Sequence, residues 1–477
     1  MRSIRNKAGK IIFIFTFCCF CLIYVKVPAL TPPQQIIVDV TNVITNVSHN
    51  PIGINLNFLL DRGAVFTALK ELNLGSLRYP IGEIADYYLF DRNNPTQPQI
   101  SVQDPNLWFS QFTNVDGTWK NPLDFDEFVS ICSSLNAEPF ITIGIDAIAY
   151  TGSSPHKTSE EVLQAAIDWV KYANIVKDYG IKYWEIGNEN DLSDDHVIWT
   201  TEEYANTVVK FSQAMKKVDP SIKIGVNGMT GSTWWDKIMP IVKDDVDFLV
   251  THQYSPIQSY EHWKSNSWNY TSNIEKAKLA IETYNPTLKI NVTENSSFNP
   301  STSHANNIWK MLHNFEMLGN TLCFHEVDYF HFWISRWLEK NSYLNDFSAF
   351  DSDYKLTPMG YSLYVWGKFI RKQMVYTSKS DNIHSWASFD RERQLLSLFL
   401  LNKNQKTQQV EVNFDHYDCN LNSERWVLRG LDPGSTKVIW QQFNPIKVKQ
   451  SKIATRLEPL SINVLTFKSS QIPINNN

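Results

Sequence analysis

The sequence predicts an α/β protein, a (β/α)8 TIM barrel with an appended C-terminal antiparallel β-sandwich. Eight short apolar runs recur over the first three quarters of the 477 residues, and stretches with helical periodicity separate them. Runs such as PFITIGI and DFLV are apolar throughout, as expected for parallel strands buried on both faces. Beyond residue 371 the helical stretches give way to a series of short strand-like runs. One barrel and one further β domain fit this chain length.

The barrel is expected to span residues 49–370. Its strands are expected at 52–58, 74–79, 139–145, 182–186, 222–226, 246–250, 288–292 and 327–334. Helical periodicity predicts helices at 159–177, 202–218, 273–284 and 303–318. A long segment rich in Asn, Pro and Gln, residues 86–122, follows the second strand. Because long loops after the strands build the functional face of such a barrel, we expect this segment to wall the site.

The predicted β-sandwich comprises residues 371–477 together with residues 31–48. Its strands are expected at 383–389, 395–402, 408–414, 425–429, 437–440 and 460–467. Val410, Val412 and Phe414 alternate with polar residues, which is the pattern of a half-buried antiparallel strand. Residues 36–44 (IIVDVTNVI) also have the pattern of a strand but precede the barrel. We therefore expect this segment to cross over and complete the sandwich.

The first 30 residues have the pattern of a signal peptide or a signal anchor. A basic segment, residues 2–10, precedes an apolar run of 15 residues at 11–25. This run is shorter than the ~20 residues that span a bilayer, and it fits a secretory signal. We expect the protein to be secreted, or to be anchored in the membrane through this segment with its body outside the cytoplasm.

The charge and the cysteines exclude several classes of protein. The net charge is −5, and residues 1–26 hold five basic and no acidic residues, so the remainder carries −10. An acidic body without a basic stripe argues against a nucleic-acid partner. Outside the apolar N-terminal run, Cys132, Cys323 and Cys419 are too few and too scattered for a disulfide framework. The chain has no HExxH motif, phosphate-binding loop or GxGxxG motif, so no metal and no cofactor is expected.

Four glycosylation sequons are present, at Asn46, Asn269, Asn291 and Asn295, and they predict modification if the host is eukaryotic. The last two lie in a segment that we assign below to the active site, so we do not expect them to be modified.

Polar residues follow the predicted barrel strands, at the face where such barrels carry their chemistry. They are Arg78, Asp146, Asn188, Glu189, Asn227, His252, Tyr254, Glu294, His331 and Trp333. Glu189 and Glu294 directly follow the fourth and seventh apolar runs and are 105 residues apart. Strands four and seven face each other across a barrel mouth, so both side chains are expected in one cleft. No role is assigned to Asp146 or to Glu326.

A pair of carboxylates ~5–5.5 Å apart is what retaining glycoside hydrolysis requires. One carboxyl group must stay protonated to protonate the leaving oxygen, and the other must stay ionised to attack the anomeric carbon. We expect Arg78 to hold Glu294 ionised, and the charge of Glu294 to raise the pKa of Glu189.

Three segments resemble motifs of the clan A glycoside hydrolases. WEIGNEN resembles the strand-four motif of this clan, and VTENSSFNP resembles its nucleophile segment. LRYPIGEIADYY resembles the strand-two motif of the branch that holds α-L-arabinofuranosidases, β-xylosidases and heparanase-like glucuronidases. A barrel followed by a sandwich, with an N-terminal strand joining the sandwich, is also the architecture of that branch. The resemblance extends over residues 51–467.

The resemblance implies a role for each residue that it matches. Glu189 would be the acid/base and Glu294 the nucleophile. The remaining matched residues would bind substrate or orient the nucleophile: Asn188 at the sugar 2-hydroxyl, Arg78 and Tyr254 on the nucleophile, His252 beside them, and Trp333 as an aromatic wall. Glu83 stands where arabinofuranosidases have a substrate-binding Asn, in Pro-Ile-Gly-Glu instead of Pro-Gly-Gly-Asn. The identity of the sugar is therefore left open.

The sequence predicts a retaining glycoside hydrolase that acts by double displacement on a plant- or matrix-type polysaccharide or oligosaccharide. The alternative is a catalytically inactive carbohydrate-binding surface protein on a glycosidase scaffold. The presence of both glutamates together with Asn188 and Arg78 favours the enzyme.

Overall fold

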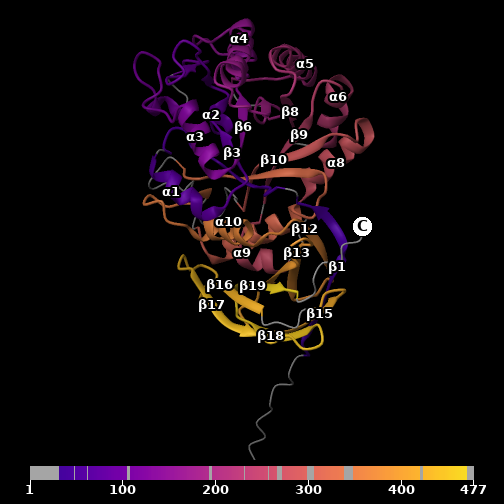
Figure 1. Ribbon diagram of the computed structural model, residues 1–477. Coiled ribbons are helices and arrows are strands. Elements are labelled where there is room, and N and C mark those ends of the chain that lie inside the picture. The colour runs from indigo at the N-terminus through magenta and orange to yellow at the C-terminus, as the bar shows by residue number, and fades with distance from the viewer. Residues whose placement is uncertain are drawn as a thin grey trace, which may run out of the picture. The chain divides into compact units, whose positions relative to one another are not determined.

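The computed structural model describes residues 32–469, apart from 48, 62, 105–107, 193–195, 230, 256, 266–270, 298–305, 338–346 and 419–422. Eight parallel strands form a closed barrel in the order β10-β11-β2-β3-β6-β7-β8-β9 (Figure 1). A second, larger sheet follows in the chain. The predicted fold class is confirmed.

Each of the eight predicted runs supplies one barrel strand. The strands are β2 (Ile52–Asn55), β3 (Ser76–Tyr79), β6 (Glu138–Ile143), β7 (Tyr183–Ile186), β8 (Lys223–Asn227), β9 (Phe248–Tyr254), β10 (Lys289–Ser296) and β11 (Val327–Phe332). Two of them, β9 and β10, extend four residues beyond the predicted ends, and those extensions carry polar residues. Apolar content alone therefore marks the carboxyl ends of these two strands too early.

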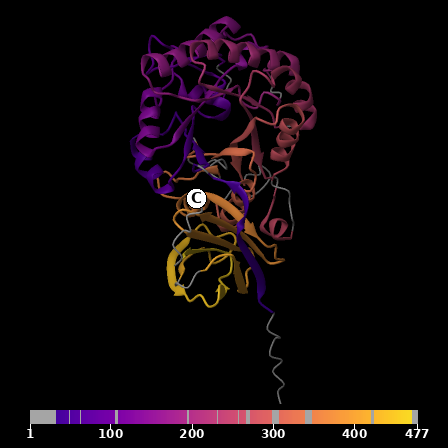
Figure 2. The same cartoon turned by 45° about the vertical axis from the view of Figure 1, so that its right-hand side comes forward.

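Helices surround the strands, and the turned view in Figure 2 shows them as a ring outside the barrel. They are α1 (Gly63–Leu72), α3 (Phe125–Leu135), α4 (Ser159–Val170), α5 (Thr201–Val218), α6 (Ser232–Val242), α8 (Ser272–Tyr284), α9 (Ile308–Thr321) and α10 (Pro358–Phe369). Three of them begin at a capping box, in which Asp124, Thr158 or Thr200 bonds the residue three positions on. A π-helical turn, Lys171–Val176, continues α4. Among the residues that the structure describes, no helix combines the length and the apolar character that crossing a bilayer requires.

The long connection after β3 contains short elements only. They are the helix α2 (Gly82–Ala85), the strand pair β4 (Tyr88–Leu89) and β5 (Gln99–Ile100), and a 3-10 turn at Trp108–Phe112. This connection contacts the loop after β6, where the Tyr150 hydroxyl donates to Asp104 (2.8 Å) and the Gln103 amide donates to the Pro155 carbonyl (2.9 Å). The two loops thus brace each other.

An aromatic layer closes the amino end of the barrel. Phe140, Tyr183, Phe248 and Tyr329 pack there with Val250, and the rings of Phe140 and Tyr183 are stacked with their centroids 4.3 Å apart. His331, a candidate from its position after a strand, lies directly on this layer, 4.7 Å from the Phe140 ring. Burial and the charge of Arg78 lower the pKa of His331 well below its usual value, so it is a neutral core residue. The aromatic layer thus fills the barrel interior at its amino end.

The second sheet has nine strands. Their order is β17 (Ile439–Ile446), β16 (Ser423–Arg429), β19 (Ser461–Lys468), β14 (Leu395–Asn402), β13 (Ile383–Asp390), β12 (Gln373–Thr377), β1 (Gln34–Asn46), β15 (Gln408–Asp415) and β18 (Lys452–Leu457). The N-terminal strand β1 pairs antiparallel with β12 and parallel with β15, and in Figure 1 this indigo strand lies among the orange and yellow ones. The rings of Phe414 and Phe467 are 4.8 Å apart although four strands separate β15 from β19, so the sheet folds back on itself around its own core.

The helices α9 and α10 connect the barrel to this sheet. Trp366 of α10 packs against Phe315 of α9 and Phe399 of β14, with centroid distances of 4.7 and 4.3 Å. One continuous hydrophobic core includes these three residues and the interior of the helical layer. Cys132 and Cys323 are free thiols, and Cys419 lies outside the described residues.

Candidate active site

Glu294 lies near the carboxyl end of β10 and is 4% exposed. The Arg78 guanidinium donates to Glu294 Oε1 (2.8 Å), and the Tyr254 hydroxyl donates to Glu294 Oε2 (2.6 Å). Burial and the charge of Glu294 raise the pKa of Tyr254 well above its usual value, so the hydroxyl keeps its proton and remains a donor. Two donors and one positive charge thus stabilise Glu294 as a carboxylate.

Arg78, at the carboxyl half of β3, is fully buried and organises the floor of the site. It donates from Nε and Nη2 to both oxygens of Glu185, at 2.9 and 3.0 Å. Nη2 also donates to Asn188 Oδ1 (2.7 Å), and Nη1 to Asn55 Oδ1 (3.0 Å). Burial alone would lower the pKa of Arg78, but the charges of Glu185 and Glu294 raise it, so the guanidinium stays charged.

Glu185 is the main residue that sequence reasoning missed. It lies inside β7, is 1% exposed, and also accepts from the hydroxyl groups of Thr142 and Thr293 at 3.4 Å each. Burying a carboxylate inside an apolar strand costs free energy unless the charge is paired. The glutamate within YWEI was therefore the sequence signal that could have predicted a buried cation nearby.

Glu189 follows β7 and is less buried, with 27% of its side chain exposed. His252 Nδ1 of β9 lies 2.6 Å from Glu189 Oε1, and His252 Nε2 lies 3.1 Å from Thr293 Oγ1. Burial would lower the pKa of His252, but the charges of Glu294 and Glu189 outweigh that effect and raise it above its usual value. His252, in contact with Glu189, therefore keeps its proton to a higher pH than a free histidine does.

The two glutamates face each other, as their positions after strands four and seven predict. One oxygen of Glu189, one oxygen of Glu294 and one nitrogen of His252 all lie within 4.8 Å of one another. Such a cluster is compact enough to hold a metal ion. The positively charged Arg78 lies 2.8 Å from Glu294, however, and it would repel a cation bound there. The carboxylate separation is close to the ~5–5.5 Å of retaining glycosidases.

Trp333, directly after β11, forms one wall of the site. A Cβ atom at Gly82 would lie 2.5 Å from the Trp333 ring and 2.7 Å from Glu294 Oε1, so the ring and the carboxylate both approach the glycine backbone. The Trp337 ring lies 5.5 Å from that of Trp333 and continues the aromatic surface. Glu83 is exposed on α2, next to Gly82. Its charge contributes, after burial and Asp146, to raising the pKa of Asp86 well above the usual range.

The other strand-end candidates lie away from the carboxylate pair. Asp146 and Asn227 bond to Asn190, the residue that follows Glu189 in the chain. Glu326 lies at the amino end of β11, where it pairs with Lys278 (2.6 Å) and His325 (3.2 Å).

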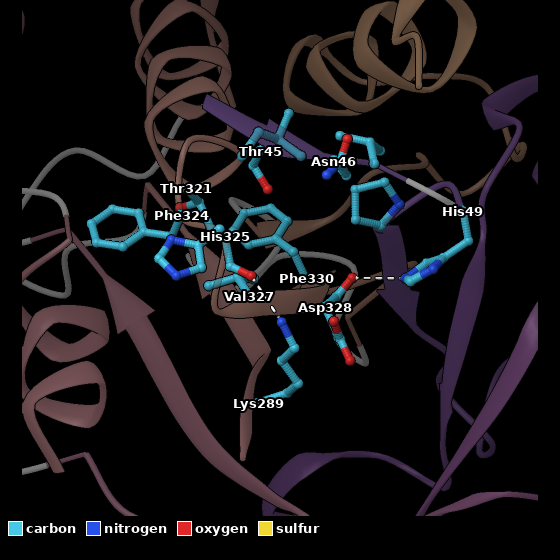
Figure 3. Close-up of a pocket in the computed structure, with 13 residues that line it drawn as sticks. Thr45, Asn46, His49, Lys289, Thr321, Phe324, His325, Val327, Asp328 and Phe330 are labelled. Carbon is cyan, nitrogen blue, oxygen red and sulfur yellow. Dashed lines mark hydrogen bonds between the residues drawn. The ribbon is translucent and has the colours of Figure 1, made fainter. Parts of the chain in front are cut away.

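A pocket of about 400 Å³ lies at that same amino end and is drawn in Figure 3. Lys289 and Val327, the first residues of β10 and β11, contribute to its wall. Within it, His49 Nε2 lies 3.1 Å from the Asp328 carbonyl, and Lys289 Nζ donates to the His325 carbonyl (3.0 Å). The pocket is therefore at the opposite end of the strands from Glu189 and Glu294.

Known proteins are similar to part of this sequence and to its fold. Residues 68–271 match the family described as the alpha-L-arabinofuranosidase 1 domain. The probable alpha-L-arabinofuranosidase C of Aspergillus fumigatus is 32% identical over 203 residues, which are 39% of this chain and 35% of that protein. The intracellular exo-alpha-(1->5)-L-arabinofuranosidase of Acetivibrio thermocellus is 25% identical over 210 residues, 40% of this chain and 39% of that protein. The chain thus spans little more than a third of the length of these curated relatives.

The solved structures extend the similarity over the fold. A GH51 alpha-L-arabinofuranosidase from Thermotoga petrophila has a TM-score of 0.73 at 18% identity, covering 91% of this chain and 99% of its own. A family 44 xyloglucanase from Paenibacillus polymyxa has a TM-score of 0.63 at 14% identity, covering 92% of this chain and 99% of its own. These likenesses show the fold, which proteins named for different substrates share. The family match over residues 68–271 and the partial matches to curated relatives show that this chain is similar to the α-L-arabinofuranosidases.

Proposed function

We propose that the protein is a retaining glycoside hydrolase that releases α-L-arabinofuranosyl groups from arabinose-containing oligosaccharides or polysaccharides. The observation that carries this proposal is the pairing of two carboxyl groups, within 4.8 Å, in different environments. Glu294 accepts from a buried guanidinium and a tyrosine hydroxyl, whereas Glu189 contacts a buried histidine. Two environments that separate the protonation of two acids are what double displacement needs.

In the first step Glu294 attacks the anomeric carbon. A bond forms between its carboxylate oxygen and that carbon, while the bond from the carbon to the leaving oxygen breaks. Glu189 delivers a proton to the leaving oxygen, so the departing group leaves as a neutral alcohol. Arg78 stays bonded to Glu185 and Asn188 and keeps the nucleophile in place as its charge is lost to the new bond.

In the second step water replaces the leaving group. Glu189, now a carboxylate, takes a proton from the water as the water oxygen bonds the anomeric carbon and the bond to Glu294 breaks. The configuration at carbon is inverted twice and therefore retained, and both glutamates return to their starting states.

His252 assists the proton transfers of Glu189 in both steps. Its Nδ1 atom is 2.6 Å from Glu189, and the pKa of His252 is raised by the nearby carboxylates. A protonated His252 beside Glu189 can share its proton with the acid that protonates the leaving oxygen.

Two observations favour a neutral arabinofuranosyl group over a uronic acid. The curated relatives are named as arabinofuranosidases. Arg78, the cation at the centre of the site, also has its donors directed to Glu185, Glu294, Asn188 and Asn55, so it is not available to a substrate carboxylate. A charged sugar would meet Glu189 and Glu294 without a compensating contact from Arg78.

A panel of aryl glycosides tests the proposal. We expect hydrolysis of the α-L-arabinofuranoside with retention of configuration, and covalent labelling of Glu294 by a mechanism-based fluorinated arabinofuranoside. Preferred hydrolysis of a xyloside or a glucuronide would refute the substrate assignment only. No turnover of any pentoside, hexoside or uronide, together with no labelling of Glu294, would refute the enzyme itself and favour a carbohydrate-binding protein.

A further inference from the structure

Glu189 stands on an unusual piece of backbone. Gly187 and Glu189 both have positive φ angles, +76° and +48°, on either side of Asn188. A glutamate rarely adopts this left-handed conformation, because its Cβ then crowds the following carbonyl oxygen. Contacts from elsewhere in the molecule must therefore hold the segment in its observed shape.

Asn190 makes those contacts and is 3% exposed. Its backbone amide donates to Asn227 Oδ1 (3.1 Å), and Asn227 Nδ2 donates back to Asn190 Oδ1 (2.8 Å). Asn190 Nδ2 donates to Asp146 Oδ1 (2.9 Å), which also accepts from the Trp199 indole (3.0 Å). One side chain thus joins the carboxyl ends of the three neighbouring strands β6, β7 and β8.

The surroundings are shaped around this amide. A Cβ atom at residue 187 would lie 1.8 Å from Asn190 Oδ1, so only glycine leaves room for it there. Asn227 Nδ2 also donates to the Ile186 carbonyl (3.0 Å), which accepts from the Tyr204 hydroxyl at 3.0 Å as well. The backbone is therefore fixed both before Gly187 and after Glu189, and the residue carrying the acid lies between these two fixed points.

We infer that Asn190 is a positioning residue for the acid/base Glu189, and that Asp146 and Asn227 act through it. This inference rests on the function proposed above. The Asn190 side chain is buried and its amide is engaged by Asp146 and Asn227, so we assign it no direct part in the chemistry. It fixes the direction from which the Glu189 carboxyl group reaches the leaving oxygen, and a small misplacement of a catalytic group lowers its rate steeply.

The dependence of the rate on the leaving group tests this role. Dinitrophenoxide departs with little help from an acid, whereas phenoxide needs protonation. We expect Asn190→Ala to lower kcat/KM about 10- to 100-fold on phenyl α-L-arabinofuranoside and less than about 3-fold on the dinitrophenyl substrate. Asn174→Ala is the matched control, since Asn174 has an equally well bonded amide, to Ile181 and Asp219, in the helical layer. We expect this control to leave the ratio of the two substrates unchanged.

A reciprocal exchange tests the contact itself and keeps the inference falsifiable if Asn190→Ala fails to fold. N190D places a second carboxylate against Asp146 and should lower both the unfolding midpoint and the phenyl/dinitrophenyl ratio. D146N removes the acceptor charge at the other end of the same bond. The double variant N190D/D146N restores one donor opposite one acceptor, and we expect it to recover both readouts to within about 3-fold of the wild type in rate.

The outcomes separate this inference from the proposed function. Equal losses on both substrates, or no recovery in the double variant, would overturn the positioning role while the wild type remains an active arabinofuranosidase. A wild type that hydrolyses neither substrate would overturn the proposed function and this inference with it.

Discussion

At the scale of single residues, a network of buried charges around Arg78 holds the carboxylate of Glu294 in place. Arg78 bonds both to Glu185, which lies inside β7, and to Glu294, the proposed nucleophile. Its position is set by Glu185 from below, and Asn188 and Asn55 bind it from the sides. If Glu294 is the nucleophile, as proposed, its position depends through Arg78 on the buried carboxylate of Glu185.

Removing Glu185 tests this dependence. We expect Glu185→Ala to lower the free energy of unfolding by about 3 kcal/mol, because Arg78 would lose two bonds in a buried site. Denaturant unfolding measures it, and Lys157→Ala is the control, since the exposed ion pair Lys157–Glu161 should contribute less than about 1 kcal/mol. A loss in Glu185→Ala no larger than in the control would contradict the account of a buried network.

The pH dependence of activity tests the Glu189–His252 pair. Because the pKa of His252 is raised, we expect the basic limb of kcat/KM to lie above the ordinary histidine value of about 6.5. His252 loses its proton as the pH rises through its pKa in the folded protein. The charged form of His252 also stabilises the fold. This contribution is complete below the pKa of the unfolded state and is lost as the pH rises through the folded-state pKa. In His252→Asn the limb should move to lower pH, because Glu189 must then hold the proton alone. An unchanged limb would show that His252 does not share the proton.

At the scale of elements, the helix α9 joins the barrel to the nine-stranded sheet through a buried carboxylate. Glu316 is 1% exposed and accepts from Lys403 Nζ and Trp263 Nε1 at 2.6 Å each, and it is also in contact with His384 Nδ1. Burial would raise the pKa of Glu316, but His384 and Lys403 outweigh it and lower the pKa to about 2. Barrel helix and sheet are thus linked by a charge as well as by apolar packing.

This link makes stability depend on pH in the acid range. The depressed pKa of Glu316 contributes stability above its ordinary value of about 4.5, and that contribution is lost as the pH falls through about 2. We expect the wild type to lose about 3 kcal/mol more than Glu316→Gln between pH 6 and pH 2, measured by denaturant unfolding at each pH. Parallel pH curves for the two proteins would show that the carboxylate charge contributes nothing to this junction.

Sequence patterns predict the starts of some helices but not all strands of the second sheet. The capping boxes at Thr158 and Thr200 set helix starts that local chemistry alone predicts. The strands β12 and β18 were not predicted, because QMVYT and KIATRL are short and mixed in polarity. They form because their neighbours, β1 and β15, supply backbone partners from distant parts of the chain.

At the scale of the whole molecule, the sequons differ sharply in their accessibility. Asn46, at the end of β1, is exposed, whereas Asn291 and Asn295 are fully buried within β10. Asn269 lies outside the described residues. A buried asparagine in a folded strand cannot reach an oligosaccharide donor without unfolding of that strand.

We propose that the chain enters the secretory pathway through its N-terminal segment, which lies outside the described residues, and glycosylation tests this route. Expressed as the full chain in a eukaryotic host, the protein should be found in the medium or on the cell surface, with a glycan at Asn46 and none at Asn291 or Asn295. Glycopeptide mass spectrometry measures the occupancy, and Asn46→Gln is the control. Modified Asn295 in active protein would contradict the buried position of this strand, and an unmodified intracellular protein would contradict the route.

Local sequence patterns are sufficient to predict the barrel and the positions of the two glutamates. Each barrel strand contains a short, mainly apolar run, and Glu189 and Glu294 follow two of these runs, so both the strands and the end at which the carboxylates lie follow from local patterns. The side chains that surround the glutamates depend on long-range contacts in the folded protein. The tertiary structure placed Glu185 under Arg78, Asn190 behind Glu189, and His331 in the core, because these pairings join residues far apart in the chain. Hydrogen-bond partners across a barrel depend on the stagger of its strands, and a pattern within a single strand contains no information about that stagger.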